Sequence, residues 1–291
     1  MRYALVGNND GPLRLLKALI KAGLPLPVFV GLQKKPDVPL FKKYTEILDK
    51  TPFQTTFEEA ALIHHLEGKE IESIVNCFCN FKFTKLLELY RCYNIHPSYL
   101  PRYRGRHPLH WALINGEKHH GITLHEMSPK YDDGAIIWQE KVALNENMSV
   151  ADLRELLMQK LEMHFPAVFA KIMANSAEKQ PNFIENSTYI KRRSPEDSEL
   201  TEWHDGALLY RKIKALRSET NPAFISLKTN KKLPIIDVKW EKKDIISEKK
   251  VSPEILKIEK NALLIKTADN HKIWLITEEN QPNSIQINFR A

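Results

Sequence analysis

The part of the chain richest in groups that can do chemistry is residues 94–108, which read NIHPSYLPRYRGRHP. Asn94 and His96 are two residues apart, so on an extended strand their side chains point to the same face and can reach one substrate atom. A second polar cluster, KYDDG at residues 130–134, supplies the carboxylate of Asp132 as a partner for the imidazole. An amide donor, a base and a carboxylate together are typical of acyl transfer.

Each of these three residues also has a structural interpretation. His96 suits a general acid or base, but a histidine at the end of a strand can simply cap a loop. Asn94 could donate to a developing oxyanion or form an Asx-turn. Asp132 could hold one tautomer of His96 and stabilise its protonated form, or serve only the turn that Asp133-Gly134 indicates. The neighbouring Asn94 favours function for His96, whereas spacing alone favours the turn for Asp132.

Arg102, Arg104 and Arg106 alternate along the same segment. Their planar guanidinium groups suit phosphate or carboxylate, although a solvated loop is the preferred interpretation for Arg102. The formal net charge of +7 favours an anionic partner such as a nucleotide, a polyglutamyl tail or RNA. The lysines are scattered along the whole chain, so a solvated basic surface explains the charge equally well.

The composition bounds the class of protein. A length of 291 residues predicts one large domain or two smaller ones, and 43% hydrophobic residues allow a sizeable core. No apolar run approaches the roughly 20 residues that span a bilayer, and the start of the chain lacks a signal-peptide pattern, so we expect a cytoplasmic protein without a membrane partner. The three cysteines, Cys77, Cys79 and Cys92, fit neither a disulfide framework nor a zinc site.

The first part of the chain alternates short apolar runs with helical patterns. Residues 3–6 and 27–31 predict strands around a helix that starts near residue 13, and the turn lacks the G-x-G-x-x-G of a dinucleotide site. Further predicted elements are a loop at 34–39, a helix at 57–66, a strand at 71–78, a helix at 84–90, a strand at 93–96, a helix at 108–114, strands at 121–127 and 135–142, and a helix from Ser149 that Pro166 should kink or interrupt. This order predicts an α/β domain over residues 1–175, with a mostly parallel, Rossmann-like sheet.

The composition changes after residue 175. Residues 176–202 are polar and rich in turn formers, which predicts a linker. Beyond it, one helix at 207–216 precedes short β-like runs at 233–240, 262–268, 272–277 and 284–289. Residues 203–291 are therefore expected to form a small β-rich, barrel-like domain.

Residues 94–108 follow the pattern N-x-H-x-S-x-L-P-x-x-R-G-x-x-P, and NGE at 115–117, GITLHEM at 121–127 and D-x-G at 132–134 come after it. This long pattern resembles the folate-dependent formyltransferase family. The resemblance covers essentially the whole chain, because RRSPEDSELTEWH at 192–204 is similar to the linker of two-domain members and the β-rich end to their open-barrel, OB-like domain. Within the family, residues 104–111 and 195–198 are most similar to the formyltransferase domain of the bifunctional enzyme that modifies UDP-4-amino-4-deoxy-arabinose.

The resemblance implies a function and a site. The implied reaction transfers a formyl group from 10-formyltetrahydrofolate, as co-substrate, to the primary amine of an amino-sugar nucleotide. Asn94, His96 and Asp132 match the family's catalytic triad, in which Asn94 and protonated His96 stabilise the oxyanion, and Asp132 tunes His96 and helps remove the amine proton, directly or through water. The remaining expected contacts are Ser98, Arg102, Arg104 and Arg106 for the acceptor, and Phe81, Lys82, Phe83, Leu87, Asp133 and Gly134 for the folate. No metal is needed.

Two alternatives remain open. Residues 7–12 lack the turn expected of methionyl-tRNA formyltransferase, but the basic loop at Lys34-Lys35 resembles that enzyme's tRNA-contacting loop. The other alternative is a catalytically inactive nucleotide- or RNA-binding member of the family, against which the intact Asn94, His96 and Asp132 speak. The identity of the amino sugar and the oligomeric state are left open by the sequence.

Overall fold

The computed structural model describes residues 1–49, 51–55, 58–217, 220–229, 231–242, 251–278, 285–287 and 289. The chain divides into two compact units, each made of separate stretches of sequence. The first contains residues 1–105, 121–142 and 155–190, and the second contains residues 106–120, 143–154 and 191–291. The polar segment 176–202 is therefore divided between the two units.

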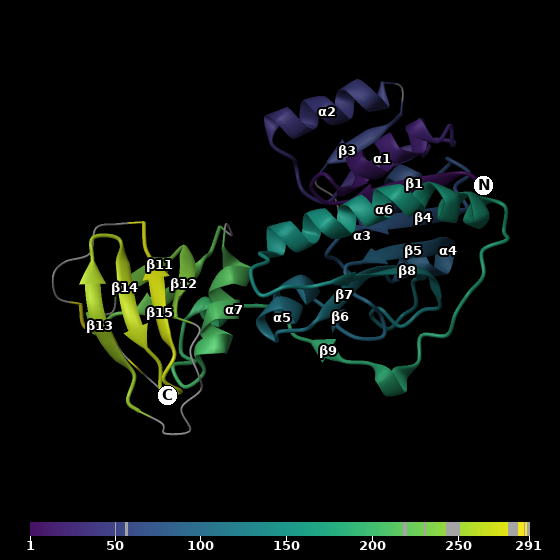
Figure 1. The fold of residues 1–291 in the computed structure, drawn as a ribbon. Helices are drawn as coiled ribbons and strands as arrows, with labels where there is room; N and C mark the ends of the chain where they lie inside the picture. The colour runs from purple at the N-terminus through teal and green to yellow at the C-terminus, as the bar shows by residue number, and fades with distance from the viewer. Residues whose placement is uncertain are drawn as a thin grey trace. The chain divides into compact units, whose positions relative to one another are not determined.

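A seven-stranded sheet in the order β3-β2-β1-β4-β5-β7-β8 is the centre of the first unit (Figure 1). Its strands are β1 (Tyr3–Gly7), β2 (Phe29–Leu32), β3 (Phe53–Thr55), β4 (Ser73–Cys77), β5 (Arg91–His96), β7 (His119–Glu126) and β8 (Ile136–Ala143). The pairs from β3 to β5 are parallel, and β7 pairs antiparallel with β5. Every residue of β1, β2 and β4 is buried, as expected for parallel strands covered on both faces. The predicted α/β fold with a mostly parallel sheet is confirmed.

Helices cover both faces of this sheet. Successive side chains of β1 point to opposite faces: Ala4 and Val6 join an apolar cluster with α3 (Glu59–Leu66) and α4 (Lys85–Leu89), whereas the Tyr3 ring lies 4.6 Å from the ring of Phe169 in α6 (Val150–Met173). On that second side α1 (Gly11–Lys21) lies beside α6, because Arg14 forms ion pairs with Glu155 and Glu162. Both faces of β1 are thus covered by packed helices.

Two local predictions differ from the structure. The expected loop at 34–39 instead leads into a helix, α2 (Val38–Leu48), followed by the short strand β3. Pro39 reads as a helix breaker, yet proline fits the first turn of a helix, where the N–H it lacks has no intrahelical partner, and Asp37 caps this turn by accepting from the Leu40 N–H. Pro166 does not interrupt α6, which continues through it as one helix of 24 residues. At its start Ser149 and Asp152 exchange hydrogen bonds, the pattern that caps the first turn of a helix.

The second unit contains two helices and antiparallel sheets. The helices are α5 (Pro108–Ile114) and α7 (Gly206–Leu216), and the strands are β10 (Ala223–Ser226), β11 (Lys232–Ile235), β12 (Asp237–Lys242), β13 (Glu254–Glu259), β14 (Ala262–Lys266) and β15 (Lys272–Ile276). Strands β12-β15-β14-β13 form one sheet and β10-β11 another, so a β-rich part does follow the parallel sheet. The predicted strand at 284–289 lies partly outside the described residues, and its Ile287 forms an isolated bridge to Leu227.

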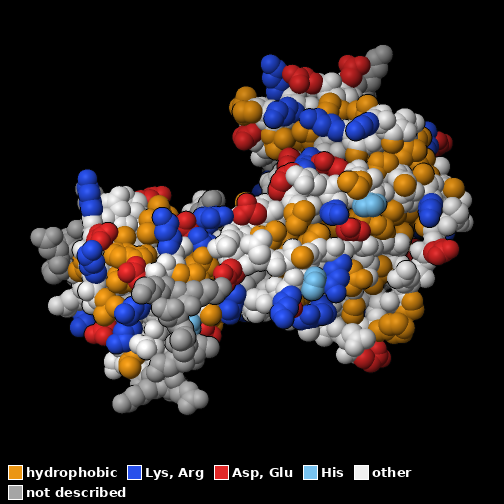
Figure 2. Space-filling model, in the orientation of Figure 1, with side chains coloured by type: hydrophobic (Ala, Val, Ile, Leu, Met, Phe, Trp, Pro, Cys, Tyr) orange, Lys and Arg blue, Asp and Glu red, His pale blue; other side chains and the backbone are white. Residues whose placement is uncertain are grey.

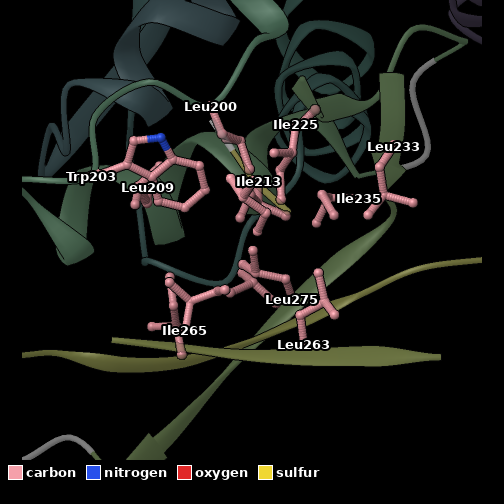
Figure 3. Close-up of a cluster of buried hydrophobic side chains, with 14 of the residues drawn as sticks. Leu200, Trp203, Leu209, Ile213, Ile225, Leu233, Ile235, Leu263, Ile265 and Leu275 are labelled. Atoms are coloured by element: carbon pink, nitrogen blue, oxygen red, sulfur yellow. The ribbon is translucent and has the colours of Figure 1, made fainter. Parts of the chain in front are cut away.

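Apolar side chains from α7 and from both sheets form the core of this unit (Figure 3). Leu209 and Ile213, one turn apart on α7, are fully buried, as are Ile265 on β14 and Leu275 on β15. The alternation of buried and exposed residues on β11 is the pattern expected of a strand with one covered face. The core is therefore built by the helix and the inner faces of the strands together.

Charged side chains are mixed on the visible surface. Figure 2 shows Lys and Arg side chains interspersed with Asp and Glu over the visible face of each unit. This distribution agrees with the scattered lysines of the sequence. None of the helices that the structure describes is long and apolar enough to cross a membrane.

Candidate active site

Three neighbouring strands carry a row of polar side chains at one level of the sheet. Asn76 on β4 is paired with Asn94 on β5, and Asn94 is paired in turn with His125 on β7. Two residues further along β5, His96 is opposite Thr123. Asn94 and His96 therefore share a face of β5 near its carboxyl end, as the spacing of two residues predicts. The carboxyl edge of parallel strands is where α/β sheets place their ligands.

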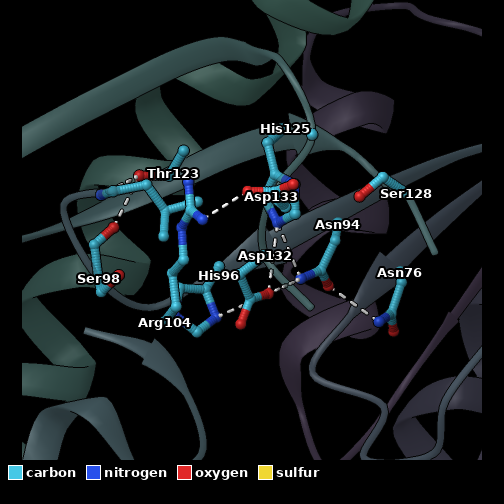
Figure 4. Close-up of polar contacts among 12 residues, drawn as sticks. Asn76, Asn94, His96, Ser98, Arg104, Thr123, His125, Ser128, Asp132 and Asp133 are labelled. Carbon is cyan, nitrogen blue, oxygen red and sulfur yellow. Dashed lines mark hydrogen bonds and ion pairs between the residues drawn. The ribbon is translucent and has the colours of Figure 1, made fainter. Parts of the chain in front are cut away.

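The loop between β7 and β8 brings Asp132 to this row (Figure 4). Its Oδ1 lies 3.5 Å from His96 Nδ1, 3.3 Å from Asn94 Nδ2 and 3.6 Å from His125 Nε2. Its Oδ2 accepts a hydrogen bond from the Gly105 N–H at 2.9 Å. Asp132, which is 38 residues from Asn94 in the sequence, thus contacts both Asn94 and His96.

The hydrogen bond at the far side of the His96 ring sets its tautomer. His96 Nε2 lies 2.9 Å from the Tyr103 carbonyl oxygen, which can only accept, so Nε2 carries the proton. Nδ1 then presents its lone pair on the side of Asp132. Burial lowers the pKa of His96, and the Asp132 charge opposes that shift, so the ring is neutral at rest.

Asp132 is held as a carboxylate. Burial alone would raise its pKa, but His96, His125 and the Gly105 N–H together hold that pKa well below its usual range. Its backbone lies in the left-handed region, with φ of 51°. Such a conformation in an L-residue is uncommon and needs support from its surroundings.

That support comes from a segment some 50 residues further along the chain. Asn182 Nδ2 donates to the carbonyl oxygens of both Asp132 and Gly134, at 2.9 and 3.0 Å. Arg104, whose side chain is fully buried, donates to Asp133 Oδ1 at 2.5 Å and to Asn182 Oδ1 at 2.7 Å. A Cβ on Gly134 would lie 2.0 Å from a carbonyl oxygen of β7, so only glycine allows this close approach. Asp133 therefore forms a buried ion pair in addition to any turn role.

Two short strands hold the segment that contains Arg104 and Gly105. β6 (Arg104–Gly105) pairs with β9 (Tyr189–Ile190), and the Tyr103 N–H donates to Thr188. Gly105 has φ of 102°, and a Cβ on it would lie 2.5 Å from the Ile190 carbonyl oxygen. Gly105 is thus required where its own N–H reaches Asp132.

The expected acceptor contacts are in different settings. Ser98 is fully buried, and its hydroxyl donates to the Arg102 carbonyl oxygen. Arg102 is exposed, with its guanidinium 5.6 Å from the centre of the Tyr103 ring. The Arg104 guanidinium contacts Asp133 and Asn182, so a substrate contact there would have to displace these partners. Arg106 is partly exposed and is the first residue of the second unit.

The expected folate contacts lie beside the apolar cluster under α3 and α4. Phe83 is buried in that cluster, and Phe81 and Leu87 pack against it. The Lys82 amine lies 5.6 Å from the centre of the Tyr131 ring, next to Asp132 in the sequence. Their contact with folate stays a prediction.

Three residues of the site were not predicted from the sequence. His125 and Asn76 flank Asn94 in the row across the sheet, and Asn182 holds the Asp132 loop. A signal for His125 exists, because Thr123 and His125 share one face of a predicted strand in GITLHEM. Asn76 stands out only once the parallel register is known, and Asn182 lies in a polar stretch with no pattern. Among the described residues there is no cluster of His, Cys, Asp and Glu that could hold a metal ion.

Comparison with known proteins gives one family and several solved structures. The model of the formyl transferase family matches residues 32–169. The N-formyltransferase of Helicobacter canadensis, solved with folinic acid and dTDP-3-aminofucose, superposes with a TM-score of 0.72 at 19% identity, covering 95% of this chain and 99% of that one. WlaRD, a sugar 3N-formyl transferase solved with dTDP and 5-N-formyl-THF, gives 0.71 at 18% identity, covering 97% and 99%.

A variant of HypX from Aquifex aeolicus gives a TM-score of 0.67 at 17% identity. Here 94% of this chain is covered, but the chain spans only 43% of the length of HypX. At these identities the likeness to solved structures establishes the fold. The fold it establishes includes the parallel sheet on which Asn94 and His96 lie.

Proposed function

We propose that the chain transfers a formyl group from 10-formyltetrahydrofolate to the primary amine of an amino-sugar nucleotide, and the match of the formyl transferase family model to residues 32–169 supports this. The observation that carries the proposal is that the ionised Asp132 contacts both Asn94 and buried His96 at the carboxyl end of a parallel strand. The three residues supply a hydrogen-bond donor, a base and a carboxylate, the groups that catalyse acyl transfer.

The proposed chemistry needs no covalent enzyme intermediate. The amine lone pair of the acceptor attacks the formyl carbon, and the carbonyl electrons move onto oxygen. The Asn94 amide donates to that oxyanion, giving up its longer, 3.3 Å contact with Asp132. His96 Nδ1, which carries a lone pair at rest, takes the proton that the amine loses, and Asp132 stabilises the resulting imidazolium. The bond from the formyl carbon to N10 then breaks as N10 receives a proton, leaving tetrahydrofolate and the formamide.

The choice of acceptor is supported by the solved structures with the same fold. The Helicobacter canadensis enzyme was solved with dTDP-3-aminofucose, and WlaRD with dTDP. We propose the same class of acceptor for this chain. Exposed Arg102 and partly exposed Arg106 remain candidates for its diphosphate, together with Ser98 and Arg104 if their internal contacts are released.

The remaining assignments are proposed on the same basis. The folate would lie near Phe81, Lys82, Phe83 and Leu87 and the loop that contains Asp133 and Gly134. The β-rich end of the chain is proposed to be an OB-like open barrel, with domain limits of 1–175 and 203–291. We also propose a cytoplasmic location, where folates and sugar nucleotides are available.

An acceptor screen tests the function. The protein is mixed with 10-formyltetrahydrofolate and, separately, with dTDP- and UDP-linked 3-amino and 4-amino sugars or with initiator methionyl-tRNA, and the release of tetrahydrofolate is followed. We expect turnover with at least one amino-sugar nucleotide and none with the tRNA. Formylation of the tRNA alone would replace the proposal with the tRNA function, for which exposed Lys34 and Lys35 provide a contact surface. Folate binding without transfer to any acceptor would favour an inactive family member.

A further inference from the structure

We propose that Asn76 is a positioning residue: with His125 it fixes which way the Asn94 amide faces. The three side chains form one row across β4, β5 and β7, and hydrogen bonds join them from end to end (Figure 4). The inference rests on the proposed function, because it concerns the group assigned to the oxyanion.

A backbone donor determines which way the Asn76 amide faces. The Cys79 N–H lies 2.9 Å from Asn76 Oδ1 and can only donate, so the atom at that position is the oxygen. The other end of the Asn76 amide is therefore Nδ2, which donates to Asn94 Oδ1 at 2.9 Å. Asn76 is only 3% exposed, so water does not compete for these bonds. The direction of the peptide N–H at Cys79 thus decides which atom of Asn94 faces Asn76.

The opposite end is set by a backbone acceptor. His125 Nδ1 lies 2.6 Å from the Glu126 carbonyl oxygen, which can only accept, so Nδ1 carries a proton. The tautomer protonated at Nδ1 alone has a lone pair on Nε2, which accepts from Asn94 Nδ2 at 3.1 Å. The two ends agree, because each requires Asn94 to turn its oxygen to β4 and its nitrogen to β7.

This orientation matters for the proposed chemistry. One N–H of Asn94 is directed to His125, and the other to Asp132 at 3.3 Å. In the flipped orientation the Asn94 oxygen would face both the Asp132 carboxylate and the His125 lone pair, and no N–H would be left for an oxyanion beside Asp132. Asn76 never touches the substrate in this scheme, yet it secures the donor.

Two substitutions at Asn76 and one matched control separate positioning from packing. Asn76→Ala removes the link to Asn94. Asn76→Asp keeps the shape, but a carboxylate has no hydrogen to donate to Asn94 Oδ1, whereas the protonated acid can accept from the Cys79 N–H and donate to Asn94 at the same time. Ser73→Ala truncates another fully buried residue of β4, whose hydroxyl has no hydrogen-bond partner among the described residues.

The expected kinetic result has three parts. Asn76→Ala should lower kcat by about 10²-fold, close to the loss of one oxyanion donor, with KM for both substrates within about twofold. Ser73→Ala should leave kcat unchanged. For Asn76→Asp, the ratio of its kcat to that of the wild type should rise by about tenfold as the pH falls from about 8 to about 6, because protonation restores the donor. Asn76→Ala should show no such rise.

A second measurement does not depend on activity. Hydrogen exchange of the Asn94 side-chain amide, assigned by NMR through its loss in Asn94→Asp, should be faster in Asn76→Ala than in the wild type and unchanged in Ser73→Ala. If the wild type formylates no acceptor, the proposed function fails while this measurement still decides the inference. Asn94 exchange unaltered in Asn76→Ala, or in an active enzyme a kcat within about twofold of the wild type, overturns it.

Discussion

Asp132→Asn should abolish most activity while leaving the fold intact. The substitution keeps the size of the side chain and an oxygen that can still accept from the Gly105 N–H, but it removes the negative charge beside His96. At 3.5 Å and an effective dielectric constant of about 20, the attraction between a carboxylate and an imidazolium is about 5 kcal/mol. If the imidazolium forms on the reaction path, losing that attraction lowers kcat by about 10³-fold.

The neighbouring Asp133→Asn is the matched control. Asp133 pairs with the fully buried Arg104, so its loss should lower the free energy of unfolding by about 3 kcal/mol without removing the charge next to His96. We expect Asp132→Asn to change kcat with little effect on Tm, and Asp133→Asn to change Tm with a much smaller effect on kcat.

Steady-state kinetics at saturating donor, together with thermal melts of the same preparations, give both quantities. A loss of kcat below about tenfold in folded Asp132→Asn would refute the electrostatic argument. A larger loss of kcat in Asp133→Asn than in Asp132→Asn would show that the wrong carboxylate has been assigned.

Three further predictions follow from the same region. His96→Asn should reduce kcat by roughly 10²–10⁴-fold with Tm near that of the wild type, and retention of most activity would exclude His96 as the base. Gly105→Ala should lower both Tm and kcat, because its Cβ meets the Ile190 carbonyl oxygen and displaces the N–H that donates to Asp132. We expect the free energy of unfolding to decrease by about 1–3 kcal/mol, and an unaltered Tm would contradict this. Burial, with nearby His110 and arginine charges, lowers the pKa of His107 to about 4. As the pH falls from about 6.5 to 4, this histidine is therefore protonated in the unfolded chain but not in the folded protein, and the free energy of unfolding decreases. After allowance for solvent screening we expect about 1–2 kcal/mol of this loss to disappear in His107→Asn, measured by urea unfolding at both pH values.

The shared face of Asn94 and His96 could be predicted from sequence because it depends only on strand periodicity. The two residues are two positions apart, and β5 runs through both of them. The role of Asp132 in the site was predicted from the family resemblance, because its spacing in the sequence favoured a turn. Spacing could not predict this role, because Asp132 reaches the site through a left-handed backbone conformation, and the carbonyl oxygen of Asp132 accepts a hydrogen bond from Asn182, 50 residues further along.

The roles of Asn76 and Arg104 could not be predicted from sequence. Asn76 contacts Asn94 because β4 and β5 pair in parallel with these two residues opposite each other. The sequence of either strand alone does not determine that register. Arg104 alternates with two other arginines that look equivalent in sequence, yet it alone of the three is fully buried and forms an ion pair with Asp133. Helix α2 was missed for a local reason: Pro36 and Pro39 signal a loop unless the first turn of a helix is considered.

The bonds from Asn182 to the Asp132 loop also bear on the order in which the protein folds during synthesis. Every strand of the central sheet has been made once residue 143 is complete, but the loop that presents Asp132 gains its clamp only about 40 residues later. A nascent chain would therefore hold a packed sheet and an unsecured carboxylate at the same time, because domains fold from the amino terminus as they emerge. A fragment that ends at residue 175 should keep its core and lose this clamp, so completion of the site is separated in time from formation of the sheet that carries it.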